Sequence, residues 1–403
     1  MRERLRAVIC QNVSLGEHLA LSTYLRNLAK QLAQVEGVEL HVIAQKGRSA
    51  LRPLTFRLVE IEGDTYSIPG NVRFTMGAFG ALRRIGEDGK IDLIHCLYPF
   101  SSLAAAALFK VAFSRGTKIV YDLRSPWIEN SMKRLGLRDD DAPLMATAYR
   151  KTAYAAERLL TRLVDGYVVI TKGLMDFYSD FIAIGRKPIL VLPSGVDNNL
   201  FRPAAGSGTR ERLGINPSDF LIGYVGTLNR ERDLGFLLRA LRHLVDGEGG
   251  EERYLMLLVG SGDGREELER LARELGVEDR VIFMGNVQHE EVPGFLAALD
   301  AAVCHLPDDL SFRYSFPMKI LEYAACGIPV FASRIPAHEE ISRRLPVILY
   351  DAHEPSDLAE KIRSAPVMRP DPCKVESFSW PRLASELVSF MSKLCGKEGA
   401  CRS

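Results

Sequence analysis

The sequence lacks an excess of charge of either sign. Its 403 residues carry 52 lysines and arginines against 51 aspartates and glutamates, which gives a formal net charge of +1. Nucleic-acid binding draws its affinity from many clustered cations that displace counterions from phosphates. A nearly neutral chain provides no such field, so no nucleic-acid partner is expected.

Cysteine and histidine are also sparse. The seven cysteines form no Cys-x-x-Cys pair, and several stand beside apolar residues, as Cys304 and Cys326 do. A disulfide scaffold or a zinc site would need paired or clustered ligands, and the eight histidines are scattered as well. We expect reduced thiols in a cytoplasmic protein that has no metal site.

Long apolar runs are missing too. The run within Met1 to Cys10 ends at Gln11 and Asn12, which is too short for a signal peptide and is typical of a first strand. The longest apolar stretch, Leu103 to Phe113, is interrupted by Lys110 and falls short of the roughly 20 residues that a spanning helix needs. No membrane-spanning segment is expected.

What the chain does have is an ordinary globular composition, with 47% apolar and 26% charged residues. At roughly 100 to 200 residues per domain, its length favours two domains. Short apolar runs bounded by Gly, Pro or Asp alternate with helical patterns, which is typical of βαβ units. The fold class predicted is therefore α/β, with two doubly wound, Rossmann-like domains.

The predicted strands fall into two series. Those of the first are Arg6–Cys10, Glu39–Ala44, Leu93–Cys96, Lys118–Tyr121, Gly166–Ile170 and Ile189–Leu192. Those of the second are Phe220–Val225, Tyr254–Val259, Val281–Met284, Ala301–Cys304, Pro329–Ala332 and Val347–Tyr350. A turn-rich run between them places the domain boundary, giving an N-terminal domain 1–196 and a C-terminal domain 197–375. Residues 376–403 form a helix and tail that can pack back on the first domain.

The helical pattern from about Pro143 to Val164 admits two interpretations. Its apolar stripe contains Met145, Ala148, Thr152, Ala155, Leu159 and Leu163, with Arg150, Lys151, Arg158 and Arg162 on other faces. We favour a helix that packs this stripe into the core and solvates its basic side. The alternative is a surface that meets an anionic membrane or a lipid acceptor.

Ligands of parallel sheets bind beyond the carboxyl ends of the strands, where the second domain is rich in glycine. Gly226–Arg232 follows one predicted strand and Gly260–Gly264 follows the next. Such loops let backbone N–H groups approach an anion, but the second loop can equally be a tight turn. Cations at a helix start oppose the helix dipole, so Arg230 and Arg232 favour a bound anion.

The densest motif is Pro317–Val330, in which Lys319 and Glu322 stand three positions apart on a short helix. The pair can be a surface ion pair worth a few tenths of a kcal/mol. Alternatively, Lys319 neutralises a diphosphate while Glu322 accepts hydrogen bonds from ribose hydroxyls. Spacing alone leaves both open.

At these residues the chain resembles the retaining glycosyltransferases of the GT-B fold (glycosyl transferases group 1, family 4-like), which include glycogen synthases and lipid mannosyltransferases. The pattern Pro-x-Lys-x-x-Glu-Tyr-x-Ala-x-Gly-x-Pro-Val at Pro317–Val330 carries the resemblance, with support from Val191–Asp197, Tyr224–Leu228 and Leu258–Gly262. The resemblance implies two domains facing across a cleft that closes about Gly195. It also implies transfer of a sugar from a nucleotide-diphosphate-sugar, with retention and without a metal.

The resemblance also implies residue roles. Asp122, Arg232, Lys319 and Glu322 correspond to catalytic positions, and Arg124 to an acceptor-binding one. The donor-binding positions are Gly16, Gly226, Thr227, Arg230, Gly262, Val287, Pro317 and Met318. The donor is a co-substrate, so no cofactor is expected.

The sequence departs from the family pattern at Tyr314, where a glutamate is usual, and Asp122 stands near the place of a frequent histidine. Two other functions therefore stay open: a catalytically silent binding or assembly protein and a nucleotide-sugar epimerase. The acceptor expected is a glycan, a polysaccharide precursor or a lipid-linked sugar. Basic side chains such as Arg83, Arg84 and Arg158 could make a peripheral contact with anionic lipids at the inner membrane face, and their alternative role is solvation.

Overall fold

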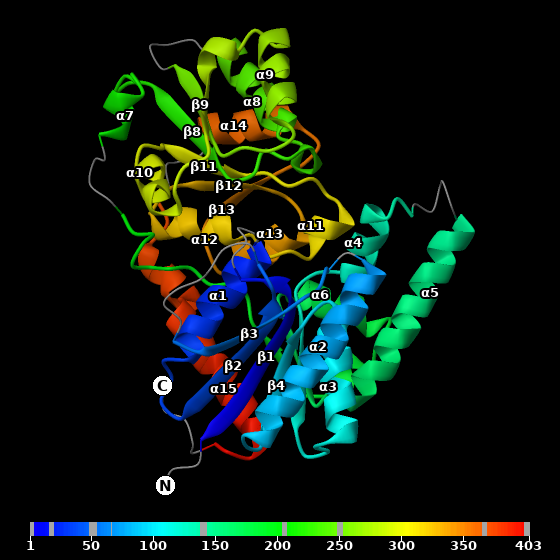
Figure 1. The fold of residues 1–403 in the computed structure, drawn as a ribbon. Helices are drawn as coiled ribbons and strands as arrows, with labels where there is room; N and C mark the ends of the chain where they lie inside the picture. The colour runs from blue at the N-terminus through cyan, green and yellow to red at the C-terminus, as the bar shows by residue number, and fades with distance from the viewer. Residues whose placement is uncertain are drawn as a thin grey trace. The chain divides into compact units, whose positions relative to one another are not determined.

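The computed structural model describes residues 4–15, 20–47, 55–65, 67–137, 143–203, 208–247, 253–364 and 369–398. The chain forms two compact units (Figure 1). Unit 1 comprises residues 1–194 together with 380–403, and unit 2 comprises residues 195–379. The chain therefore leaves unit 1 once, builds unit 2, and returns to unit 1 for its last helix. The boundaries expected from the sequence were residues 196 and 375.

Unit 1 is built on a seven-stranded parallel sheet with the order β3-β2-β1-β4-β5-β6-β7. Its strands are β1 (Leu5–Ser14), β2 (Val38–Gln45), β3 (Arg57–Ile61), β4 (Leu93–Leu97), β5 (Lys118–Leu123), β6 (Gly166–Val169) and β7 (Ile189–Val191). The central strands β1, β4 and β5 are buried along nearly their whole length, because a parallel sheet is covered on both faces. The strand order reverses between β1 and β4, which is the switch point of this sheet.

The helices of unit 1 are α1 (Ala20–Leu32), α2 (Ile68–Glu87), α3 (Phe100–Ala112), α4 (Trp127–Arg134), α5 (Pro143–Leu160), α6 (Lys172–Ser179) and α15 (Trp380–Cys395). Right-handed crossovers place α1 on one face of the sheet and α2 and α3 on the other. The last helix, α15, packs against α1, and Trp380 contacts Tyr24 with ring centroids 5.7 Å apart. It thus completes the layer that α1 begins.

Strand β3 was missed in the sequence analysis. It lies at the edge of the sheet, where it pairs only with β2, and its charged residues Arg57 and Glu60 are exposed. An edge strand needs no continuous apolar run. Its five residues therefore carried too little apolar signal to be recognised.

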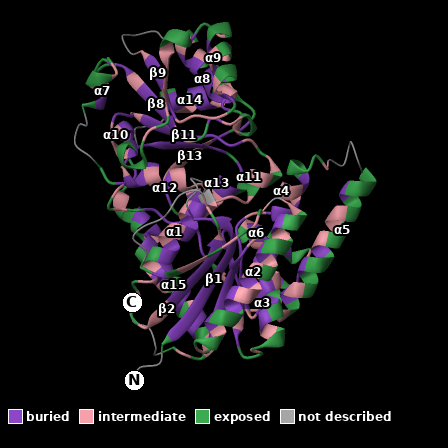
Figure 2. Ribbon diagram, viewed as in Figure 1, coloured by how far each residue is buried: buried purple, intermediate pink, exposed green. Residues whose placement is uncertain are grey.

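The prediction that α5 packs its apolar stripe into the core is wrong. Met145 and Leu159 are 66% and 61% exposed. The helix instead buries Ala146, Tyr154 and Glu157, and the colours of Figure 2 show how much of it is left uncovered. This opposite face packs against α3 and α4.

No described helix combines the length and the apolar character needed to cross a membrane.

Unit 2 contains a six-stranded parallel sheet with the order β10-β9-β8-β11-β12-β13. Its strands are β8 (Phe220–Val225), β9 (Tyr254–Val259), β10 (Val281–Gly285), β11 (Ala301–Cys304), β12 (Val330–Ser333) and β13 (Val347–Tyr350). Its helices are α7 (Thr209–Arg212), α8 (Gly235–Asp246), α9 (Arg265–Glu274), α10 (Val292–Leu296), α11 (Leu310–Arg313), α12 (Met318–Ala325), α13 (Pro336–Ser342) and α14 (Pro355–Ser364). The switch point lies between β8 and β11.

Two apolar cores cover the two faces of this sheet. One includes Leu237 and Leu241 of α8, and the other includes Ile320 and Leu321 of α12. Packing on both faces fixes α12 in the crossover from β11 to β12. Its first turn, which contains Lys319, is thereby set close to the carboxyl end of β8, as the contacts of Lys319 described next show.

Candidate functional site

Lys319 lies at the switch point of unit 2. Its ammonium donates a hydrogen bond of 2.8 Å to the Tyr224 hydroxyl and sits 4.1 Å from the centre of that ring. Tyr224 belongs to β8 and is itself held by a bond from its hydroxyl to the Thr227 carbonyl, 3.0 Å. Among the described interactions, no carboxylate pairs with Lys319. A cation placed here can therefore meet the negative charge of a ligand.

Gly226, the residue after β8, makes room for this amine. A Cβ added at Gly226 would come within 2.0 Å of the Lys319 Nζ, and the backbone there has a φ of +147°. Only glycine combines that conformation with that clearance. The glycine that the sequence marked as a donor-binding position thus shapes the seat of Lys319.

Glu322 lies one turn after Lys319 on α12 and is partly buried. Burial raises the pKa of its carboxyl to about 7, against the lowering effect of the Lys319 charge. Within the described part of the chain the carboxylate accepts no hydrogen bond, and it forms no ion pair with Lys319. The surface ion pair that spacing left open is not formed, so both groups keep capacity for a ligand.

The cations of the loop after β8 have protein partners. The Arg232 Nε donates to the Thr227 hydroxyl at 2.9 Å and the side chain is partly buried. Arg230 is exposed and pairs with Glu267 at 3.3 Å. Of the two, only Arg232 is seen to bond Thr227, whose carbonyl also holds Tyr224, and this links Arg232 to the seat of Lys319.

The glycines of the loop after β9 serve close packing. Cβ atoms added at Gly260, Gly262 and Gly264 would lie 2.0, 2.5 and 2.8 Å from backbone atoms of Gly226 and Leu228. Several backbone N–H groups already donate hydrogen bonds from one of these loops to the other, as the Leu228 N–H does to the Ser261 carbonyl at 2.9 Å. This favours the tight-turn interpretation of the glycine run over an anion-binding one.

Three further predicted donor positions lie at the start of α12 or just after β10. Pro317 precedes α12, Met318 begins it, and Val287 follows β10 with its side chain against the core. Tyr314, in the place of the usual glutamate, follows α11. Gly16 lies outside the described residues.

In unit 1, the predicted catalytic Asp122 is fully buried at the end of β5. Its carboxylate accepts bonds from Arg124 Nε at 2.7 Å, His95 Nε2 at 3.0 Å and the Tyr24 hydroxyl at 3.3 Å. Burial opposes its ionisation, but the Arg124 charge and the His95 hydrogen bond outweigh that effect and lower the pKa of Asp122. Asp122 is therefore a buried anion whose carboxylate oxygens already accept hydrogen bonds from these three residues.

Arg124, the predicted acceptor-binding residue, is the counter-ion of this anion and is 5% exposed. Its Nη1 donates to the Leu192 carbonyl at 2.9 Å, and its guanidinium stacks 3.6 Å from the Tyr24 ring centre. His95 and Tyr24 were not singled out in the sequence. A histidine inside an apolar strand run was the one signal that could have revealed this network.

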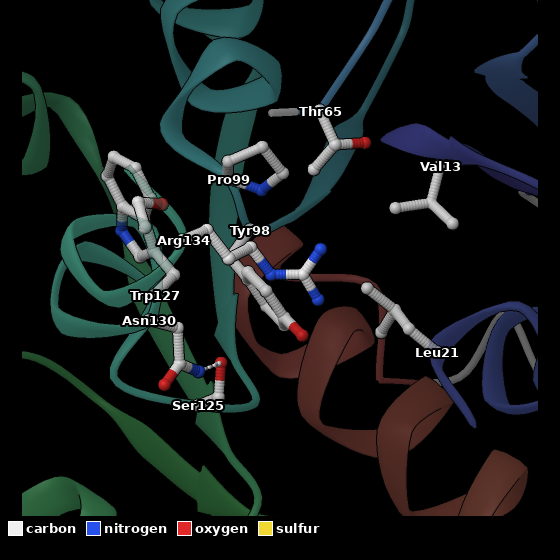
Figure 3. Close-up of a pocket in the computed structure, with 10 residues that line it drawn as sticks. Val13, Leu21, Thr65, Tyr98, Pro99, Ser125, Trp127, Asn130 and Arg134 are labelled. Atoms are coloured by element: carbon white, nitrogen blue, oxygen red, sulfur yellow. Dashed lines mark hydrogen bonds between the residues drawn. The ribbon is translucent and has the colours of Figure 1, made fainter. Parts of the chain in front are cut away.

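A pocket of about 220 Å³ opens beyond the carboxyl ends of β1, β4 and β5 (Figure 3). Tyr98 and Pro99 follow β4, Ser125 follows β5, and Trp127 and Arg134 come from α4. The pocket therefore lies at the switch point of unit 1, as Lys319 does in unit 2. None of these residues was a candidate in the sequence analysis.

Trp127, in the wall of the pocket, is held in place by Glu157. Its indole N–H donates to the Glu157 carboxylate at 3.1 Å, and the Tyr121 hydroxyl donates to the same oxygen at 2.8 Å. Burial raises the pKa of Glu157 to about 7, against the lowering effect of both hydrogen bonds. Glu157 thus holds the indole in one orientation.

No group of three or more histidine, cysteine, aspartate or glutamate side chains is arranged to hold a metal ion in the described ranges.

Two family models match the chain in tandem. Residues 21–200 match the model described as Glycosyltransferase Family 4, and residues 219–365 match the model described as Glycosyl transferases group 1. The chain belongs to the GT-B-fold glycosyltransferases. The first matched segment lies in unit 1, apart from its last residues after Ser194, and the second lies in unit 2. The family match therefore extends over both units of this glycosyltransferase.

Relatives of this glycosyltransferase include two proteins named D-inositol 3-phosphate glycosyltransferase. The one from Corynebacterium jeikeium is 27% identical and aligns with 94% of this chain and 93% of its own length. The one from Actinosynnema mirum is 27% identical, with 93% and 92% aligned.

Solved structures share the fold. Sucrose-phosphate synthase from Thermosynechococcus elongatus matches with a TM-score of 0.75 and 17% identity over 97% of this chain and 99% of that one. Anabaena Alr3699/HepE in complex with UDP matches with a TM-score of 0.72 and 16% identity over 96% and 100%. The predicted GT-B fold class is confirmed.

Proposed function

We propose that the protein transfers a sugar from a nucleotide-diphosphate-sugar, bound by unit 2, to a hydroxyl of an acceptor bound by unit 1. The observation that carries this proposal is the ammonium of Lys319. It stands at the switch point of unit 2 on the Tyr224 ring, with no carboxylate partner among the described residues. A departing nucleoside diphosphate develops negative charge that such a cation stabilises.

Each unit contributes groups suited to its part. Lys319 and Arg232 carry positive charge for the diphosphate, and Glu322 has an unused carboxylate for ribose hydroxyls. The structural relative HepE, solved with UDP, supports a nucleotide-sugar as the donor class. Asp122 and Arg124 are buried, and they hold in place the end of β5 against which an acceptor would lie.

The finer features of the reaction are part of the same proposal. We expect retention of the anomeric configuration, no metal and no cofactor. The acceptor is a glycan, a polysaccharide precursor or a lipid-linked sugar, and the names of the relatives add inositol 3-phosphate to these candidates.

We further propose that the protein is cytoplasmic and touches the inner membrane face through α5. The outward side of this helix exposes Leu144, Met145 and Leu159 together with Lys151 and Arg158. The only acidic residue of the helix, Glu157, is buried. Apolar and basic side chains on one helix face suit an anionic lipid surface.

The donor site is tested by thermal stabilisation with a panel of nucleoside diphosphates and nucleotide sugars, because ligand binding raises stability by mass action. A shift for one base, absent in Lys319→Ala and Glu322→Ala, is expected. No shift with any compound would favour a silent binding protein. Conversion of the donor without any acceptor would favour an epimerase.

A further inference from the structure

Strand β8 extends further than its pairing with β11. The pairing of β8 with β9 continues to Val225, the last residue of the strand. The pairing with β11 ends two residues earlier, at Gly223 opposite Ala302. The two strands therefore separate before β8 ends, which is how a crevice opens at a switch point. On that side the backbone N–H and C=O of Val225 need partners other than a strand.

The side chain of Tyr323 supplies both partners. The Val225 N–H donates to the Tyr323 hydroxyl at 3.0 Å, and this hydroxyl donates to the Val225 carbonyl at 3.4 Å. Tyr323 belongs to α12 and is fully buried. Burial raises the pKa of Tyr323 well above its usual range, so the hydroxyl keeps the proton that it donates. One residue of α12 thus takes the place of a strand partner at the end of β8.

Two side chains of α12 contact the end of β8 in succession. Lys319 and Tyr323 stand four positions apart and so share one face of the helix. Lys319 bonds the hydroxyl of Tyr224, and Tyr323 bonds the backbone of the next residue, Val225. Lys319 is only partly buried, whereas Tyr323 is closed off from ligands. The first can meet a ligand, and the second can only hold the helix.

We propose that Tyr323 is a positioning residue of the donor site, because its two bonds to Val225 hold α12 against β8 and thereby place the Lys319 ammonium. The inference rests on the proposed function, in which Lys319 acts on the diphosphate. Without the hydroxyl, two backbone groups at the end of β8 lose their partner. The first turn of α12 is then held less firmly, and a small misplacement of a charged group is costly at a binding site.

The test variant is Tyr323→Phe, which removes only the hydroxyl. Calorimetric titration of the full-length protein with UDP measures the effect, with ADP and GDP as probes if UDP does not bind. We expect the variant to bind the diphosphate about tenfold more weakly. The matching monophosphate lacks the second phosphate, so its affinity should fall less. A variant that had only lost stability would keep the ratio of the two affinities.

A double-mutant cycle shows whether Tyr323 acts through Lys319. In a Lys319→Ala background, adding Tyr323→Phe should leave the affinity for the diphosphate unchanged, because the group that Tyr323 positions is already absent. The control is Tyr350→Phe, which removes an equally buried hydroxyl, bonded to His305 at 3.0 Å, from the edge strand β13. This control should lower the melting temperature and keep the affinity. All titrations are made below the melting temperature of every variant.

Three results would overturn the inference: unchanged diphosphate affinity in Tyr323→Phe, equal loss for diphosphate and monophosphate, or a further loss in the Lys319→Ala background. If Lys319→Ala weakens binding and Tyr323→Phe does not, only the role of Tyr323 fails and the donor site stands. If no nucleoside diphosphate binds the wild type, the proposed function fails and the inference fails with it.

Discussion

At the switch point of unit 1, Asp122 and Arg124 are partners of each other, with His95 and Tyr24 completing a buried network. At the switch point of unit 2, Lys319 rests on Tyr224 and Glu322 accepts no hydrogen bond from a described residue. Two sheets of the same kind thus use charge differently. The first pairs its deepest charges with each other inside the unit, and the second keeps its charges for a ligand.

The largest expected effect tests the structural use of charge in unit 1. Asp122→Asn leaves the buried Arg124 uncompensated, which should lower the free energy of unfolding of this unit by about 3–5 kcal/mol. Urea denaturation measures it. Glu62→Gln, which breaks the exposed pair with Lys46, should leave stability almost unchanged. An Asp122 variant as stable as the wild type would remove the contrast between the units.

Lys319→Ala tests the opposite use of charge in unit 2. Loss of a cation that stabilises the leaving group should lower the transfer rate by about 10²–10³-fold, with the melting temperature little changed. Gly226→Ala should have a similar effect, because its Cβ would occupy the place of the Lys319 amine. Lys361→Ala, in a partly exposed pair with Asp357, is the control. An unchanged rate in Lys319→Ala would contradict the donor site.

Glu157→Gln tests the pH dependence. The pKa of Glu157 is raised in the folded state from 4.5 to about 7, so its contribution to stability is full below pH 4.5 and is lost as the pH rises through 7. The shift corresponds to about 3 kcal/mol. The glutamine variant should lose less stability than the wild type between pH 5 and pH 8, measured by denaturant titration.

The comparison with Glu322→Gln sharpens this prediction, because the pKa of Glu322 is also raised to about 7. Both variants should flatten the pH profile, but only Glu322→Gln should weaken nucleotide binding. If Glu157→Gln weakened nucleotide binding equally, the assignment of the two glutamates to different tasks would be wrong.

The smallest expected effect concerns α5. The double reversal Lys151→Glu with Arg158→Glu should weaken binding to vesicles of phosphatidylcholine and phosphatidylglycerol by at least about 30-fold, because each cation near the surface contributes about 1 kcal/mol and the new carboxylates are repelled. Co-sedimentation measures it. Arg270→Glu with Arg382→Glu makes the same change of net charge at exposed sites elsewhere. Equal loss in both double variants would indicate a general charge effect rather than a surface on α5.

Much of the fold could be predicted from the sequence, because strands buried on both faces read as uninterrupted apolar runs. That signal found β1 and β8 but not the edge strand β3. On α5 periodicity identified an apolar stripe without showing which side of the helix is buried. Packing of Ala146 and Tyr154 against the unit decided that question, and it depends on neighbours that are distant in sequence.

The candidate site could be predicted in part. The motif around Lys319 and Glu322 is local in sequence, so its spacing was visible. The seat that Gly226 and Tyr224 provide for Lys319 required the approach of β8 to α12. The pocket residues Val13, Tyr98 and Trp127 follow no motif and come together only through the sheet order.

The return of the chain to unit 1 has a consequence for biosynthesis. Helix α15, which covers α1, leaves the ribosome only after all of unit 2 has been synthesised. Domains generally fold as units during synthesis. Unit 2 can therefore be complete while the apolar surface that receives Leu383 and Leu387 is still open. The nascent first domain must wait with that surface uncovered, and a chain truncated before residue 380 would expose it permanently.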